Sequence, residues 1–99
     1  MIVAFSVSPS GGDPDGGVSE AVAKAVRVVR DSGLPNSTNA MFTNVEGSWD
    51  EVMDVVKRAV EAAGEGASRV SLVLKADIRP GFEGGQLEAK VARVEEHLR

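Results

Sequence analysis

Residues 41–51, with the sequence MFTNVEGSWDE, join a strand to a helix and set the frame for the rest of the chain. The first six of these residues favour extended structure, because phenylalanine, threonine and valine prefer strands. Ser48 and Glu51 then have the spacing of a capping box, in which a serine and the third residue after it satisfy the free amides of a helix start. The stretch therefore predicts a strand over residues 41–46 and a helix that begins at Trp49.

The segments around this junction follow the two periods of regular secondary structure. The helix keeps apolar residues on one side as far as Ala63 and is followed by glycines. Residues 68–79 alternate apolar and polar side chains, which predicts a long strand. A short strand over residues 36–39 precedes the junction, and a tight turn near residues 39–40 joins the two. The middle of the chain is therefore expected to form a hairpin, a helix and a strand in succession.

The two ends of the chain supply the remaining elements. Residues 2–8 alternate in the same way, and Pro9 is expected to end that strand. A helix capped by Ser19 follows and stops at Gly33, because serine favours helix starts and glycine favours helix ends. After two glycines at residues 84–85, apolar residues at helical spacing predict a final amphipathic helix. These apolar residues are Leu87, Val91, Val94 and Leu98.

The order of elements, β-α-β-β-α-β-α, consists of two β-α-β halves of similar length and one extra helix. This order predicts an α+β fold, the ferredoxin-like βαββαβ sandwich, with an antiparallel sheet and both long helices on one face. With 99 residues, 42% of them hydrophobic and 26% charged, the chain has the size and composition of a compact globular domain. We therefore expect a single domain over residues 1–99.

Cysteine, histidine and charge content exclude several classes of function. The absence of cysteine excludes disulfides, thiol nucleophiles and cysteine-based metal sites. The one histidine, His97, lies close to the C-terminus, which argues against histidine-pair metal sites and serine–histidine triads. A net charge of −4 without a cluster of Lys and Arg argues against nucleic-acid binding. No apolar run approaches the roughly 20 residues of a membrane span, and no secretory signal is visible, so we expect a cytoplasmic protein. We also expect no bound metal and no cofactor.

Strand alternation assigns side chains to the two faces of the predicted sheet. Val3, Phe5 and Val7 would face the helices, and the side chains between them would lie on the open face. That face would carry Ala4, Ser6, Ser8, Phe42, Asn44, Glu46, Ser71, Val73, Lys75 and Asp77. A mixture of apolar, hydroxyl and charged groups is typical of an interface with a polar pocket. Because the core of Val and Ala is also small, we expect a homodimer, and more specifically a homotetramer, with sheet faces packed together.

Charged residues gather near the strand ends of this open face. Glu46, Lys75, Asp77 and Arg79 can form either an ion-pair network at a subunit contact, which the sequence favours, or a small polar site. Glu46 and Asp77 could also act as paired catalytic carboxylates. No base, nucleophile or metal-ligand set accompanies them, and we therefore expect that the protein is not an enzyme.

Two further features have both a structural and a binding interpretation. Residues 9–17 lead into a helix start, where a phosphate can bind, but the loop lacks the lysine of a P-loop, and Asp13 and Asp15 would repel an anion. A mobile surface loop is the favoured interpretation. Trp49, the first residue of its helix, can stack on a flat ligand or pack over the sheet edge, and packing is favoured.

Four segments resemble the thiamine-binding protein family in order and spacing over nearly the whole chain. They are Ser8-Pro9, Ser32-Gly33-Leu34, Met41-x-Thr43-x-x-Glu46-Gly47-x-Trp49-Asp50-Glu51-Val52-Met53 and Lys75-x-Asp77-x-Arg79. The Thr-x-x-Glu-Gly-x-Trp part is the most specific. The resemblance implies a ferredoxin-like fold, dimers or tetramers assembled through the sheets, and binding of thiamine or its hydroxymethylpyrimidine part. It implies no catalytic activity.

The resemblance, together with the chemistry of thiamine, suggests a set of ligand-binding residues. They are Ser8, Phe42, Thr43, Glu46, Trp49, Lys75 and Asp77. Glu46 would accept the amino group of the pyrimidine, and the hydroxyls of Ser8 and Thr43 would bond the rest of its polar edge. Phe42 or Trp49 would stack on a ring, and an acidic protein suits the positive thiazolium. The alternative is an oligomeric regulatory or scaffold protein whose open sheet face serves only assembly.

Overall fold

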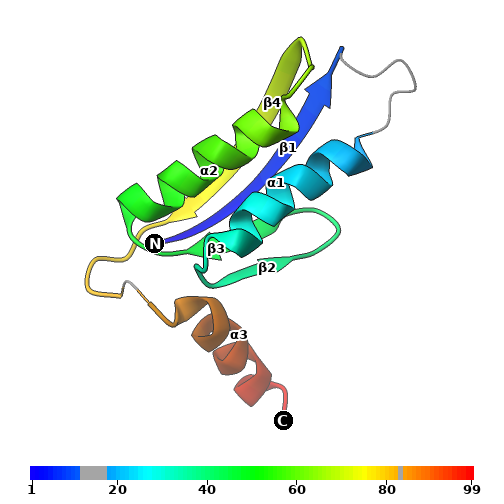
Figure 1. Cartoon of the computed structure of the whole chain (residues 1–99). Coiled ribbons are helices and arrows are strands. Elements are labelled where there is room, and N and C mark those ends of the chain that lie inside the picture. The colour runs from blue at the N-terminus through cyan, green and yellow to red at the C-terminus, as the bar shows by residue number, and fades with distance from the viewer. Residues whose placement is uncertain (12–17, 83) are drawn as a thin grey trace.

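The computed structural model describes residues 1–11, 18–82 and 84–99, and Figure 1 shows its strands and helices. In chain order the elements are β1 (Ile2–Ser10), α1 (Ser19–Asp31), β2 (Asn36–Thr38), β3 (Thr43–Glu46), α2 (Trp49–Ala63), β4 (Arg69–Asp77) and α3 (Gln86–His97). Within the described residues the strands form one sheet in the order β2-β3-β1-β4, with every neighbouring pair antiparallel. This order, with α1 and α2 together on one face (Figure 1), confirms the predicted ferredoxin-like α+β fold.

The core lies between the sheet and the layer of α1 and α2. Val3, Phe5 and Val7 of β1 are buried there, as the alternation predicted, while Ile2 and Ala4 point to the open face. The buried hydrophobic residues are Met1, Val3, Phe5, Val7, Ala25, Val29, Val45, Val52, Val55, Val56, Ala59 and Ala63. Phe5 is the only aromatic residue among them, so the core is assembled from small side chains.

The helix predicted from the capping box begins as that motif requires. Ser48 Oγ accepts a hydrogen bond from the Glu51 backbone N–H at 3.2 Å, and Glu51 Oε1 accepts one from the Ser48 backbone N–H at 3.1 Å. The bond from the Ser48 backbone holds the pKa of Glu51 below its ordinary value, because it stabilises the charged carboxylate. Gly47 exchanges two backbone hydrogen bonds with Met1, at 3.0 and 3.1 Å, and these fix the start of α2 beside the start of β1.

The strands at the centre and edge of the sheet end at other residues than predicted. Pro9 does not end β1, which continues to Ser10 with Pro9 opposite Val70. Among the described residues, β1 has only β4 beside it beyond Phe5, and a proline is tolerated at such an edge because no second strand needs its N–H. β4 itself is shorter than the predicted range 68–79 at both ends.

The start of α1 also differs from the prediction, whereas its end agrees. Ser19 does not cap the helix, because the backbone carbonyl of Val18 already accepts the first helical bond, from the Val22 N–H at 2.9 Å. Val18 therefore holds the cap position, and its apolar side chain makes no capping hydrogen bond. At the other end Gly33 has φ of 78°, the left-handed conformation for which glycine is suited.

The hairpin strands are shorter than the predicted ranges 36–39 and 41–46, because the turn between them is longer. Asn39 Oδ1 accepts hydrogen bonds from the backbone N–H groups of Met41 and Phe42, both at 2.9 Å. These bonds form a local turn and take the segment out of the strand ladder. Phe42 therefore precedes β3 and is not one of the open-face residues of that strand.

α3 is the least covered helix of the fold. It begins after Gly85, which has φ of 76°. Among the residues that the structure describes, none in α3 is buried, and Val91 and Val94 are each 60% exposed. Figure 1 shows α3 projecting away from the layer of α1 and α2. The predicted apolar stripe is thus present and largely uncovered. None of the described helices is long and apolar enough to cross a membrane.

Candidate functional site

The carboxylate of Glu46 lies where α3 meets the sheet. β3 places it opposite Ile2 on the open face, and its side chain is only 1% exposed. Its Oε2 accepts a hydrogen bond from the backbone N–H of Gln86 at 2.9 Å, and its Oε1 accepts one from that of Leu87 at 3.0 Å. The first amides of a helix have no partner within the helix and lie at the positive end of its dipole. Glu46 therefore caps α3 from a distant part of the chain.

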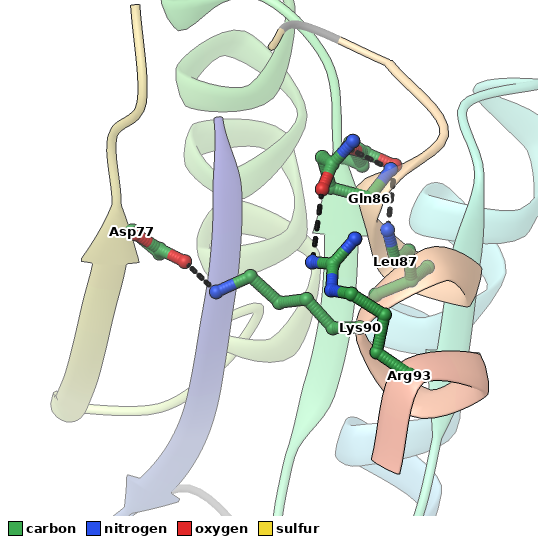
Figure 2. A network of polar contacts seen from close by, with 6 residues as sticks. Asp77, Gln86, Leu87, Lys90 and Arg93 are labelled. Carbon is green, nitrogen blue, oxygen red and sulfur yellow. Dashed lines mark hydrogen bonds and ion pairs between the residues drawn. The ribbon is translucent and has the colours of Figure 1, made fainter. Parts of the chain in front are cut away.

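A second carboxylate reaches α3 from the other side of β1. Ile2 lies opposite both Glu46 and Asp77, so the two acids occupy one face of the sheet on either side of the same residue. Figure 2 shows the Asp77 carboxylate bonded to the ammonium of Lys90, which extends from α3 across β1. The hydrogen bond and charge of Lys90 hold the pKa of Asp77 below its ordinary value. The first turns of α3 therefore lie across the end of the open face.

Within one chain the strand-end charges Glu46, Lys75, Asp77 and Arg79 form no ion pair with one another. Glu46 and Asp77 each bind α3, and Lys75 makes no ion pair within the described residues. The Arg79 guanidinium instead lies 3.8 Å from the ring centroid of Phe82, a cation–π contact. α3 supplies the partners of both acids within the chain, and an ion-pair network of these charges at a subunit contact stays a prediction.

A groove of about 710 Å³ lies between α3 and the edge strand β2. It is lined by Pro35, Asn36, Ser37, Glu46, Gly85, Leu87, Glu88, Val91, Ala92 and Glu95. Leu87 and Val91 give it an apolar wall, and Glu88 and Glu95 add carboxylates on one side of α3, since residues seven apart share a helix face. None of the described lining residues is basic. Its volume is in the range of small-molecule sites, about 300–1,000 Å³.

Sequence reasoning missed most of this groove. The sequence predicts only a hairpin strand over residues 36–39, and the spacing of Leu87 and Val91 predicts only an amphipathic helix. The glycine break before that stripe is a signal that the helix can turn back on the sheet. It does not indicate which strand edge the helix will face.

The candidate ligand residues do not form one cluster. Phe42 and Thr43 line a separate pocket of about 210 Å³ beside α1. Thr43 is buried on the helix face opposite Phe5, whereas Ser8 lies on the open face, so the two hydroxyls cannot bond one edge of a ligand. Ser8 is also about 20 Å along β1 from the end at which Glu46 lies. The sheet therefore separates residues that the resemblance placed together.

Two other candidate features are Trp49 and the loop over residues 9–17. Trp49 is 57% exposed, so the favoured packing over the sheet edge leaves more than half of its surface open. Residues 12–17 lie outside the described residues. The mobile-loop interpretation of residues 9–17, and the effect of Asp13 and Asp15 on anions, therefore stay predictions.

The fold and the groove together define the class of this protein, a ferredoxin-like α+β domain with a ligand-sized groove between its sheet edge and an added helix. The chain belongs to the thiamine-binding protein family, whose family model matches residues 3–95. This confirms the resemblance noted from the sequence motifs.

Individual relatives share the fold over nearly their full length. UPF0045 protein Mb1933 of Mycobacterium bovis is 57% identical over 99 residues, which cover 99% of this chain and 94% of that protein. Among solved structures, a domain of unknown function, DUF77, from Bacillus cereus has a TM-score of 0.80 at 36% identity and covers 93% of this chain and 86% of that one. The Thermotoga maritima protein TM0486, a candidate thiamine biosynthesis/salvage protein, has a TM-score of 0.76 at 28% identity and covers 94% of this chain and 96% of that one.

Proposed function

We propose that this protein binds thiamine, or its hydroxymethylpyrimidine part, in the groove between α3 and β2 and catalyses no reaction on it. The observation that carries the proposal is the groove, which combines apolar walls with carboxylates and has no basic residue among its described lining. Membership of the thiamine-binding protein family supports the choice of ligand. A carrier, reservoir or sensor in the cytoplasm would need only such a site.

The two rings of thiamine would meet different parts of the groove. The thiazolium carries a positive charge, which the carboxylates of Glu88 and Glu95 would attract. The aminopyrimidine is flat and would lie against Leu87 and Val91. Asn36 donates its side-chain N–H to a backbone carbonyl at 2.8 Å, and its Oδ1 is an acceptor for the pyrimidine amino group.

Of the residues predicted to bind the ligand, Glu46 lines this groove. Lys75 and Asp77 share its face of the sheet, and we propose that they contribute to the site from β4. The other predicted residues would reach a ligand only in the smaller pocket or across a contact between copies. They are Ser8, Phe42, Thr43 and Trp49.

We also propose that the protein forms a homodimer or homotetramer through its open sheet face and α3. Val73 is 55% exposed on that face, and Val94 and Leu98 of α3 are 60 and 73% exposed. Burying apolar surface of this kind stabilises an assembly by roughly 25 cal/mol per Å². A scaffold protein that only assembles would use the same surface but would leave the groove without a ligand.

Calorimetric titration with thiamine, hydroxymethylpyrimidine and thiamine phosphates tests the proposed function. Thiamine should bind, hydroxymethylpyrimidine should bind more weakly because it lacks the cation, and the phosphates should be disfavoured by Glu88 and Glu95. Light scattering on the same samples should give a mass of two or four times 10.3 kDa. An oligomer that gives no heat with any of these compounds at millimolar concentration would favour the scaffold function.

A further inference from the structure

Two hydrogen bonds to the buried carboxylate of Glu46 attach the start of α3 to the sheet. The Glu46 side chain is 1% exposed, whereas the Asp77–Lys90 pair, which also links the sheet to α3, is close to half exposed. Among the described residues none in α3 is buried, so apolar packing contributes little to its position. Within a single chain the placement of α3 relative to β2 therefore depends chiefly on the carboxylate of Glu46.

We infer that Glu46 is a positioning residue for ligand binding, which holds α3 and thereby one wall of the groove without contacting the ligand itself. The effect on the ligand rests on the proposed function. Leu87 is held directly through its backbone N–H, and Val91 follows one turn later and lines the same groove. If the bond were lost, this wall would move away from β2.

The chemistry of the contact requires a carboxylate. Each oxygen of Glu46 accepts one N–H, from Gln86 and Leu87, and neither amide has a partner inside α3. The negative charge also faces the positive end of the helix dipole. A glutamine would keep one acceptor oxygen but would turn its own N–H groups toward the second amide. Glu46→Gln therefore removes both the charge and one hydrogen bond while keeping the size of the side chain.

Within one chain, the other contacts that hold α3 to the sheet are weak. It has 12 residues, and isolated helices of about 12–15 residues or fewer are only marginally stable in water. The remaining pair of Asp77 and Lys90 is exposed, and such pairs hold elements together weakly. Release of Glu46 should therefore let α3 separate from the sheet at its start, where the groove lies.

Hydrogen exchange of the Gln86 and Leu87 amides, measured by NMR without ligand, tests directly whether Glu46 holds the start of α3. In the wild type we expect both amides to exchange at least about tenfold more slowly than in an unstructured chain. Glu46→Gln should remove this protection at the amide that faces the glutamine NH₂ and reduce it at the other, and Glu46→Asp, which keeps the charge on a shorter side chain, should retain more of it. Glu51→Gln is the matched control, because Glu51 accepts an amide at the start of α2, and it should leave both amides protected.

Thiamine affinity of the same variants tests the consequence for binding. Glu46→Gln should weaken binding about tenfold or more, and Glu51→Gln should change it less than about twofold. Val91→Ala should cost about threefold in the wild type, through lost apolar contact. In the Glu46→Gln background it should cost nothing further, because the wall is already displaced. Two changes that act through one element are not additive.

Three results would overturn the inference. The first is a wild type in which the Gln86 and Leu87 amides are unprotected. The second is a Glu46→Gln variant that binds thiamine more weakly although its Gln86 and Leu87 amides stay fully protected. The third is a double variant, Glu46→Gln with Val91→Ala, whose loss of thiamine affinity equals the product of the two single losses. The last two would indicate direct contact with the ligand. If Glu46→Gln does not fold, Glu46→Asp carries the same comparisons. If the wild type binds no ligand, the proposed function fails, and exchange still decides whether Glu46 holds α3.

Discussion

Glu46 Oε1 accepts a hydrogen bond of 3.0 Å from the backbone N–H of Leu87, which lies 41 residues later in the chain. The bond joins the last residue of β3 to the first turn of the outermost helix. It accounts for a buried acid that the strand pattern assigned either to a ligand or to an ion pair. Because the groove lies beside this contact, the same bond connects the fold with the proposed site.

Ser48→Ala should destabilise the protein without affecting ligand binding. The substitution removes the bond from the Glu51 amide to the serine oxygen, and loss of such a cap costs about 1 kcal/mol. Thermal unfolding should show a lower midpoint, while titration gives an unchanged affinity. Lys57→Ala, at an exposed position of the same helix, is the control and should leave the midpoint nearly unchanged. A large loss of affinity at unchanged stability would place Ser48 in the site.

Gly85→Ala should weaken the start of α3 through backbone strain alone. Gly85 has φ of 76°, and an added Cβ would meet no atom within 4 Å. The left-handed conformation costs a residue with a Cβ about 1 kcal/mol. Circular dichroism should show reduced helix content in the variant. Gly84→Ala is the matched control, because its Cβ also meets nothing and its φ is not in that region. Equal effects of the two substitutions would mean that the backbone of α3 can adjust.

Glu88→Gln and Glu95→Gln should each weaken thiamine binding a few-fold, because they remove negative charge from the groove. The loss should be larger at low than at high salt, since salt screens charges that face solvent. Hydroxymethylpyrimidine, which lacks the cation, should be bound equally by wild type and variants. Glu61→Gln on the exposed side of α2 serves as the control for net charge. Equal losses for all three variants would argue for a general charge effect and against the groove.

The Asp77–Lys90 pair should give a pH dependence with a definite sign. The pKa of Asp77 is lowered in the folded protein, so its contribution is complete above the ordinary aspartate value of about 3.9 and is lost as pH falls through the lowered pKa. Wild type should unfold at a higher temperature than Asp77→Asn at pH 6, and the difference should disappear near pH 2. A difference that persists in acid would mean that the substitution acts other than through this ionisation.

Val73→Asp should break the proposed assembly. Val73 lies on the open face opposite Ser6 and is 55% exposed in the single chain, so a charge there would be buried in an interface. Light scattering at micromolar concentration should show a smaller species for the variant than for the wild type. Ala23→Asp, on the exposed side of α1, should leave the mass unchanged. An unaltered mass in Val73→Asp would place the interface elsewhere.

Elements that depend on local chain geometry could be predicted from the sequence. The capping box of Ser48 and Glu51 and the stop at Gly33 lie where expected, because each involves atoms only a few residues apart. Local misses have local causes as well. Pro9 stays in β1 because the strand is at an edge there, and Asn39 extends the hairpin turn by accepting two amides. Neither the edge nor the turn is visible in hydrophobic periodicity.

The candidate site was predicted less well, since it depends on which residues become neighbours. The alternation correctly placed Asp77 on the face of Glu46, and chain order correctly placed an amphipathic helix after Gly85. The direction in which that helix leaves the sheet was not predictable. The sequence therefore did not indicate that Glu46 and Asp77 bind α3, or that α3 forms one wall of the groove.

The sequence by itself determined the order of elements, the α+β class, the two faces of the sheet and the family, because periodicity, caps and motifs are properties of neighbouring residues. The tertiary structure alone decided that Glu46 binds the start of α3 and that a groove opens between α3 and β2. The donors to Glu46 are backbone N–H groups, which nearly every residue has, so no side chain marks them in the sequence. They become available only where a helix begins, and only the folded chain brings that beginning to the end of β3.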